Sequence, residues 1–123
     1  MRVRKLRHQW GEDRAIFRQL MDAVVARILD ETYPEGQMLP SVRQLASDFD
    51  VNPLTSAKAY NELARDGLIQ PLRGEGFVVA RGARESLLKR ERSRFLKEEW
   101  PGLRERLRRL DIDLRLLAET AEE

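Results

Sequence analysis

Two helix-start signals, at Ser41 and at Asn52, stand eleven residues apart and constrain the fold of this chain more than any other feature. Ser41 is followed three residues later by Gln44, the pattern of a capping box. Asn52 is followed by Pro53, the pattern of an N-cap with proline in the first helical position. The first helix can therefore last only about two turns, and the second is expected to run from Pro53 to a left-handed cap at Gly67. Two short helices joined by a few residues are typical of a helix-turn-helix.

An amphipathic helix precedes this pair, and a β-ribbon follows it. From residue 13 to residue 31 the apolar residues come in pairs four apart, the spacing that lines one face of a helix. Residues 68–72 and 77–80 are strand-like, and Arg73-Gly74-Glu75-Gly76 between them suits a turn. Pro71 cannot donate to a sheet ladder, so the strands form an edge ribbon. We therefore expect a mainly α fold with a small β wing, a winged helix-turn-helix over residues 13–80.

Residues 81–123 return to a helical pattern and predict a tail outside the winged helix. A basic helix is expected to end near Trp100-Pro101-Gly102, because proline disrupts a helix interior. Beyond it, leucines spaced by 4, 3, 4 and 3 residues form a heptad pattern. Asp113 leaves two alternatives open, one helix or a separate last helix with Asp113 as its N-cap. The leucine face from Leu87 to Leu117 needs a partner, which predicts a dimerisation tail. The residues expected in that interface are Leu88, Phe95, Leu103, Leu107, Leu110, Leu114 and Leu117.

Composition excludes several classes of protein. The 123 residues contain no cysteine and one histidine, which rules out disulfides, thiolate nucleophiles and paired-histidine metal sites. No apolar run approaches the roughly 18–20 residues needed to cross a bilayer, so we expect a cytoplasmic protein without a membrane partner. The acidic residues are spread over predicted helix surfaces rather than paired in a pocket. We expect neither an enzyme nor a metal or cofactor site.

Charge is nearly balanced overall but unevenly distributed. The formal net charge of +2 does not by itself indicate nucleic-acid binding. Residues 1–12 form a basic N-terminal arm that carries Arg2, Arg4, Lys5 and Arg7. We interpret this arm as a loosely ordered tail, with a phosphate or minor-groove contact as the alternative.

Several short motifs follow one another in a characteristic order between about Ile16 and Val79. They are Phe17-Arg18-Gln19-Leu20, Pro34-Glu35-Gly36, Leu39-Pro40-Ser41-Val42-Arg43-Gln44-Leu45-Ala46, Val51-Asn52-Pro53-x-Thr55, Lys58-Ala59-Tyr60, Leu63, Asp66-Gly67-Leu68-Ile69 and Arg73-Gly74-x-Gly76. In these motifs, which cover roughly half of the protein, the chain resembles the GntR family of bacterial transcription regulators and, within it, the short YtrA-like subfamily. The resemblance implies a DNA-binding repressor with a two-helix dimerisation tail, and it suggests transporter genes as targets.

Three positions depart from the subfamily pattern. Ser56 stands where a branched apolar residue is usual, which suggests a slightly underpacked helix. Phe77 directly follows Gly76, where a threonine is usual near the start of the last strand, and this suggests a different wing contact. Leu54 replaces a more usual polar residue, so the DNA sequence that is read cannot be carried over from the family.

The outward face of the second short helix is the candidate DNA-reading surface. Leu54 can meet a thymine methyl group, and Thr55 and Asn52 can donate to phosphates or bases. Lys58 can neutralise a phosphate or reach guanine; its alternative is an ion pair with Glu62, four residues later on the helix. The face expected to be in the core carries Ser56, Ala59, Tyr60 and Leu63.

The resemblance adds Arg43, and it adds Arg73 and Gly74 at a wing tip that lies along the minor groove. Without the resemblance, an exposed arginine such as Arg43 would be read as merely solvated. The complete set of expected DNA contacts is Ser41, Arg43, Asn52, Leu54, Thr55, Lys58, Arg73 and Gly74.

These features predict a homodimer that binds double-stranded DNA at a palindromic operator, because a two-fold axis presents two reading helices to two half-sites. The alternative is a winged-helix protein-interaction module without specific DNA binding. Salt separates the two, since binding through several phosphates weakens steeply as salt rises. No polar cluster in the sequence supports a site for a small-molecule effector.

Overall fold

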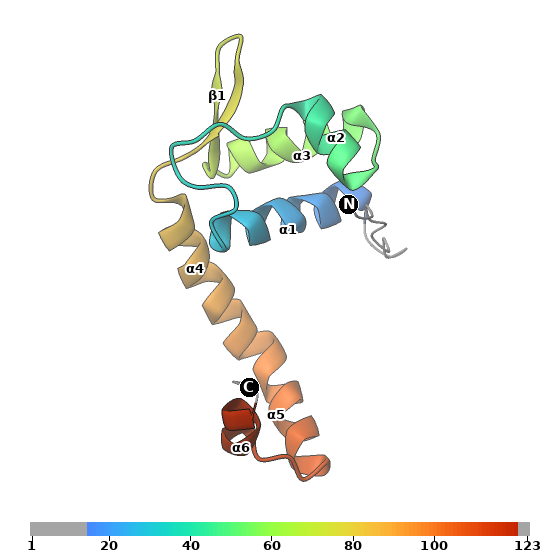
Figure 1. The fold of residues 1–123 in the computed structure, drawn as a ribbon, viewed down its shortest axis with the longest axis vertical. Coiled ribbons are helices and arrows are strands. Elements are labelled where there is room, and N and C mark those ends of the chain that lie inside the picture. Colours follow the sequence, from blue (N-terminus) through green and yellow to red (C-terminus); the bar gives the residue numbers. More distant parts are fainter. Residues whose placement is uncertain (1–14, 121–123) are drawn as a thin grey trace. The chain divides into compact units, whose positions relative to one another are not determined.

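The computed structural model describes residues 15–120, so the predicted arm at residues 1–12 lies outside the described residues. The elements follow the predicted order, and the predicted fold class, mainly α with a small β wing, is confirmed (Figure 1). The chain divides into two compact units, one ending at Leu87 and the other beginning at Leu88. The elements are α1 (Ile16–Leu29), α2 (Val42–Phe49), α3 (Pro53–Arg65), β1 (Ile69–Leu72), β2 (Gly76–Val79), α4 (Ala83–Arg94), the π-helical segment η1 (Phe95–Glu99), α5 (Trp100–Arg109) and α6 (Leu114–Thr120).

Side-chain hydrogen bonds start both short helices where the sequence predicts them. Ser41 Oγ accepts a hydrogen bond of 3.0 Å from the backbone N–H of Gln44, and α2 begins at the next residue. Asn52 Oδ1 accepts a hydrogen bond of 2.7 Å from the backbone N–H two residues on, with Pro53 as the first residue of α3. Only half of the predicted capping box forms, because the side chain of Gln44 donates to Asp48 Oδ1, 2.7 Å away, rather than reaching back to the start of the helix.

α1 ends two residues earlier than the apolar pattern predicts. Asp30 Oδ1 accepts hydrogen bonds from both the backbone N–H and the hydroxyl group of Thr32, over 3.0 and 2.7 Å. These two bonds hold the pKa of the Asp30 carboxyl below its ordinary value. Glu31 adopts a positive φ of 66°, which ends the helical path. A local turn therefore replaces the last predicted turn of the helix.

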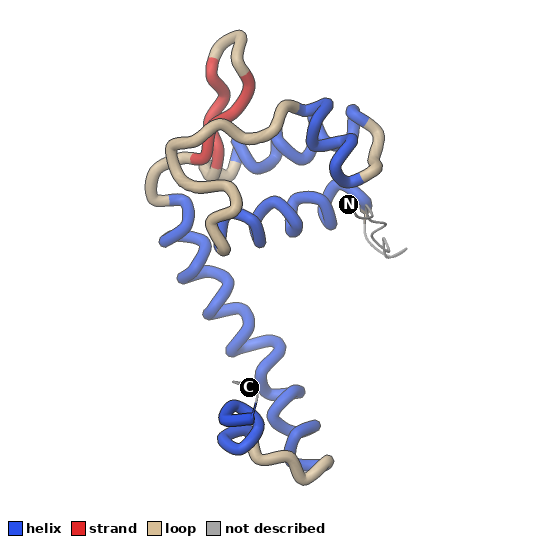
Figure 2. The backbone as a smooth tube through the Cα atoms, viewed as in Figure 1, coloured by secondary structure: helices blue, strands red, loops and turns tan. Residues whose placement is uncertain are grey.

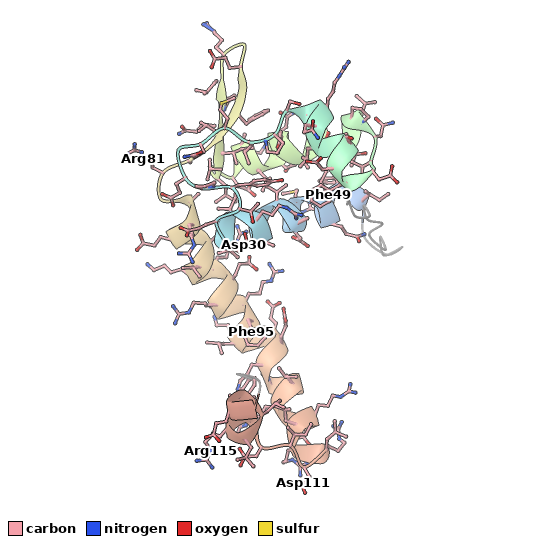
Figure 3. The ribbon with its side chains drawn as sticks, in the orientation of Figure 1. Asp30, Phe49, Arg81, Phe95, Asp111 and Arg115 are labelled. Atoms are coloured by element: carbon pink, nitrogen blue, oxygen red, sulfur yellow. The ribbon has the colours of Figure 1, made fainter. Side chains whose placement is uncertain are left out.

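The first unit has a continuous hydrophobic core built by α1, α2 and α3, the base of the wing and the first residues of α4. Phe49 is buried in it at the end of α2, close to α1, where the guanidinium carbon of Arg27 lies 4.7 Å from the centre of its ring (Figure 3). Leu87 is 1% exposed in this core, so its predicted place on the leucine face of the tail is wrong. Other side chains less than 2% exposed are Leu20, Val24, Ile28, Leu45, Ser56, Ala59, Tyr60, Leu63, Ile69 and Val79.

The wing is an antiparallel pair of four-residue strands, β1 and β2, with a third segment at its base. The loop between α1 and α2 crosses this base (Figure 2), where Met38 bridges to Val78 and the N–H of Leu39 donates to the carbonyl of Phe77 over 2.9 Å. β2 is thus paired on both sides near its base. Pro71 lies in β1, away from that second pairing, as its missing N–H requires. The extra segment fixes the wing to the helices.

The first turn of α4 is anchored to the loop that follows α1. The backbone N–H of Arg84 donates to Glu35 Oε2 over 2.9 Å, and its side-chain Nε donates to the carbonyl of Leu29 over 2.7 Å. Backbone hydrogen bonds from Gly82 and Arg84 hold the pKa of the Glu35 carboxyl below its ordinary value. A carboxylate at a helix N-terminus satisfies N–H groups that have no partner within the helix. Glu35 therefore caps α4 from a distant part of the sequence.

The tail helix does not end near Trp100-Pro101-Gly102, and the prediction that it ends there is wrong. α4 continues into η1 and then into α5 without a loop. Proline in a helix interior lacks an N–H and clashes with the carbonyl four residues earlier. The wider π-helical turn directly before Pro101 places this residue in the first turn of α5, where the missing N–H costs nothing.

α5 and α6 are separate helices, so the second of the two predicted alternatives is the one observed. Asp111 adopts a positive φ of 59° after α5. Asp113 Oδ1 then accepts a hydrogen bond of 2.9 Å from the N–H of Arg115 at the start of α6. The predicted heptad leucines are consequently divided between two helices and the connection: Leu103 and Leu107 on α5, Leu110 directly after it, and Leu114 and Leu117 on α6.

Candidate nucleic-acid interface

α3 separates into a buried face and an exposed face, as the sequence predicts. Leu54 is 79% exposed although it is apolar, Lys58 and the N-cap Asn52 are exposed, and Thr55 is half-buried. The exposed face therefore combines an apolar group, hydrogen-bonding groups and a cation, which together suit the edges and phosphates of a duplex. The residues on the buried face are Ser56, Ala59, Tyr60 and Leu63, all as predicted.

The N-terminus of α2 presents two more of the predicted residues, Ser41 and Arg43. Both are exposed, and Val42 between them is half-buried against the core. The Ser41 oxygen already accepts the capping bond, but its hydroxyl proton is still able to donate. The guanidinium of Arg43 can donate two parallel hydrogen bonds, the geometry that a guanine edge or a phosphate accepts.

The tip of the wing carries the last two predicted residues, Arg73 and Gly74, and both are exposed. The N–H of Glu75 donates to the carbonyl of Leu72 over 2.8 Å and closes the turn. Gly74 has a φ of +73°, and a Cβ built on it would meet no atom within 4 Å. The turn therefore requires glycine for its backbone conformation rather than for space, and the bare backbone allows close approach to a groove.

Two buried hydroxyl groups join α3 to α2 and to the segment before it. Ser56 Oγ lies 2.8 Å from the carbonyl oxygen of Val42 in the first turn of α2, to which it donates, and 3.1 Å from that of Pro53. Tyr60 donates its O–H to the carbonyl of Pro40 over 2.7 Å, and burial raises the pKa of its phenol. These bonds hold the start of α2, which carries Arg43, against α3. The bonds from Ser56 to Val42 and from Tyr60 to Pro40 span 14 and 20 residues, so no local pattern in the sequence predicts them.

Lys58 does not pair with Glu62, the alternative that the helical spacing allows. Glu62 lies 3.7 Å from Nη1 of Arg65 instead. The Nζ atom of Lys58 lies 4.2 Å from the centre of the Phe17 ring in α1. Phe17 is not among the residues that the sequence predicts to bind DNA, although it stands in one of the family motifs. Among the described residues, the ammonium of Lys58 thus lies next to an aromatic ring rather than a carboxylate.

The described residues offer no metal site and no membrane span. Within residues 15–120, no group of three or more His, Asp or Glu side chains could hold a metal ion. In the same range, none of the helices has both the length and the apolar character needed to cross a bilayer. The residues predicted to bind DNA on α2, α3 and the wing tip present hydrogen-bond donors, cations and one leucine, a set that can bind a polyanion without any covalent step. The exposed carboxylates of Asp48 and Glu75 lie on the same elements.

Comparison with known proteins places this site in a family. Residues 16–79, just over half of the chain, match the family described as bacterial regulatory proteins, gntR family. The HTH-type transcriptional repressor YtrA of Bacillus subtilis is 38% identical over 73 residues, which are 59% of this chain and 56% of YtrA. The uncharacterized HTH-type transcriptional regulator YhcF of Bacillus subtilis is 33% identical over 62% of this chain and 63% of its own length. The chain thus spans about three fifths of the length of these two relatives.

A solved structure extends the likeness into the tail. A protein of Bacteroides thetaiotaomicron described as a transcriptional regulator of the GntR family is 31% identical, with a TM-score of 0.59, over 88% of this chain and 94% of that one. The family model and these relatives confirm the resemblance predicted from the motifs, and they are regulators rather than enzymes. This chain belongs to the gntR family of bacterial regulatory proteins.

Proposed function

We propose that this protein is a repressor of transcription that binds double-stranded DNA as a homodimer at a palindromic operator. The observation that carries the proposal is the exposed face of α3, where a leucine that is 79% exposed stands beside Thr55 and Lys58. Thr55 and Lys58 can donate to bases or phosphates, and a thymine methyl group in the major groove is an apolar partner for the leucine beside them. The relative YtrA is described as a transcriptional repressor, which supports the same function.

α3, the start of α2 and the wing each have a separate part in this proposal. α3 enters the major groove, with Leu54 and Thr55 facing base edges and Asn52 facing the backbone. At the start of α2, Arg43 reads a base or binds a phosphate, and Ser41 donates to a phosphate. The wing places Arg73 and Gly74 along the minor groove. The buried hydrogen bonds of Ser56 and Tyr60 hold the start of α2 in a fixed position relative to α3.

A second copy of the chain completes the proposed site. The second unit has exposed apolar side chains along its length, from Phe95, labelled in Figure 3, to Leu117, with exposed fractions between 39 and 61%. η1 and α5 contain no buried residue at all. A second copy would cover this surface and place two winged helices on one duplex. The residues proposed for the interface remain Leu88, Phe95, Leu103, Leu107, Leu110, Leu114 and Leu117.

Selection of bound sequences from a pool of random duplexes tests the proposal most directly. We expect an enriched sequence that is its own inverted repeat, with half-sites one or more helical turns apart. The affinity for that sequence should fall steeply with salt, by a log-log slope of about −0.9 for each phosphate contact. A protein-interaction module would enrich no sequence, and that result would overturn the proposal.

A further inference from the structure

Two cations from different helices flank one aromatic ring at the junction of α1 and α3. The Phe17 ring, half-buried in the first turn of α1, has the Nζ atom of Lys58 at 4.2 Å from its centre and the guanidinium carbon of Arg18 at 5.3 Å. Both cationic side chains are exposed. Both distances start from the same ring centre, so the two charges cannot be farther apart than the sum of these distances. That sum is below one Debye length at 0.1 M salt, roughly 10 Å. They form a compact positive cluster in which Lys58 belongs to the residues that the sequence predicts to bind DNA and Arg18 does not.

The chemistry of the cluster favours an anion with more than one charge. The ring face attracts an ammonium group through its quadrupole without neutralising it, whereas a carboxylate would both pair with it and cancel its charge. Glu62, the acid one turn along α3 from Lys58, is already engaged with Arg65. Two like charges at this distance repel each other, and a polyanion relieves that repulsion. A DNA strand provides phosphates at an axial spacing of about 3.4 Å, so two neighbouring phosphates can meet both cations.

The Phe17 ring also restricts the position of the Lys58 ammonium group. A lysine side chain has four rotatable bonds, and holding it in one conformation costs rotamer entropy. Contact with the Phe17 face restricts the ammonium before DNA arrives, so less freedom is lost on binding. The three N–H donors of the ammonium are not used up by the ring, which leaves them for phosphate oxygens.

We propose that Arg18 and Lys58 together bind the phosphates of one DNA strand and that Phe17 is the residue that positions Lys58 for this contact. The inference rests on the proposed function and extends the interface from α2, α3 and the wing onto α1. It assigns Lys58 to the backbone rather than to a base. The contact therefore contributes affinity and register but no sequence preference.

The test measures the salt dependence of binding by the full chain to its selected duplex, using fluorescence anisotropy. The variants are Arg18→Ala, Lys58→Ala, Phe17→Leu and Phe17→Tyr, and Arg92→Ala in α4 is the matched control for loss of one positive charge. Each substitution removes one phosphate contact from each of the two copies on the operator. We therefore expect Arg18→Ala and Lys58→Ala each to reduce the log-log slope by about 1.8 and the affinity at 0.1 M salt by roughly sixtyfold. Phe17→Leu removes no charge, yet it should reduce the slope, whereas Phe17→Tyr, which keeps the ring, should retain it. Arg92→Ala should match the wild type.

Phe17 is also a packing residue, so each variant is checked by thermal unfolding, and the double variant Phe17→Leu, Lys58→Ala is included. If the ring acts through Lys58, the double variant binds no more weakly than Lys58→Ala alone. A wild-type slope for Arg18→Ala, as expected if Arg18 only pairs with Asp22 one helical turn away, would overturn the inference. The inference would also be overturned if the affinity losses of Phe17→Leu and Lys58→Ala added up in the double variant, or if Lys58→Ala changed the base preference. If the wild type binds no duplex at all, the proposed function fails first, and the two failures are thereby distinguished.

Discussion

At position 56 a hydroxyl group occupies a site where the family resemblance leads one to expect a branched apolar side chain. Read from the sequence alone, this serine suggests an underpacked helix. In the structure it is fully buried and hydrogen-bonded to the first turn of α2, fourteen residues earlier. The bond depends on how α2 and α3 pack, so no pattern local to α3 could have predicted it. The serine contributes a polar link within the helix-turn-helix rather than a gap.

Replacing Ser56 with alanine should lower the free energy of unfolding by about 1 kcal/mol, the typical net value of one hydrogen bond inside a protein. The variant leaves no carbonyl without a partner in α2, because the Val42 oxygen can still accept its helical bond. Urea unfolding at pH 7 measures the change. Ser47→Ala, an exposed serine of α2, is the control and should be nearly neutral. Equal stability of the two variants would show that the buried hydroxyl contributes nothing.

Arg43 tests the proposed base-reading surface at the scale of one side chain. It is exposed at the start of α2, so its removal should leave the fold unchanged. Arg43→Ala should weaken binding to the selected operator by about 1–3 kcal/mol if the guanidinium contacts a base, and it should relax the preference at one position of each half-site. A gel-shift titration over matched and substituted duplexes measures both effects. Unchanged affinity would remove Arg43 from the site.

The sequence predicts a helix end correctly where a nearby residue determines it. It does not predict an end that depends on contacts with distant residues. The caps at Ser41 and Asn52 each involve a hydrogen bond within three residues, and both form as predicted. Pro101 predicts a helix end that the structure does not have, because proline has the same local signature at a break and at the first turn of a new helix. Only the π-helical turn before it decides between the two. The bond from Arg84 to Glu35 spans 49 residues and has no local pattern.

The cap of α4 by Glu35 predicts a specific dependence of stability on pH. Backbone hydrogen bonds from Gly82 and Arg84 lower the pKa of this carboxyl from its ordinary value of 4.5. A carboxyl whose pKa is lower in the folded protein stabilises the fold above the pKa of the unfolded chain, and this contribution is lost as the pH falls through the folded pKa. Glu35→Gln should therefore be less stable than the wild type at pH 7, and the difference should shrink as the pH falls below about 4.5.

Urea unfolding of both proteins at several pH values between 7 and 3 measures this difference. Glu75→Gln at the exposed wing tip removes the same charge and is the matched control. A difference between wild type and Glu35→Gln that stays constant with pH would mean that the carboxylate does not stabilise the start of α4 through its charge.

At the scale of the whole molecule, the two units differ in how they use apolar residues. The first unit buries its apolar side chains in one core. In the described part of the second unit, every apolar side chain is half-buried or exposed. α6 has 7 residues, and a helix this short is marginal in water without tertiary packing. The second unit consequently lacks, within one chain, the burial that would stabilise it. Association with a second copy supplies that burial and is the basis of the proposed dimer.

Leu110→Asp tests this proposal without a cost to the fold of the monomer, because Leu110 is 56% exposed after the end of α5. A charge placed in a dimer interface must be desolvated, so this variant should dissociate. Light scattering at micromolar concentration should then change from about twice the chain mass of 14.4 kDa to that mass itself. Leu54→Asp makes the same chemical change on the exposed face of α3; it should leave the dimer intact and abolish operator binding. If Leu110→Asp stays dimeric, the tail is not the dimer interface. If Leu54→Asp dissociates, the exposed face of α3 belongs to the dimer interface instead.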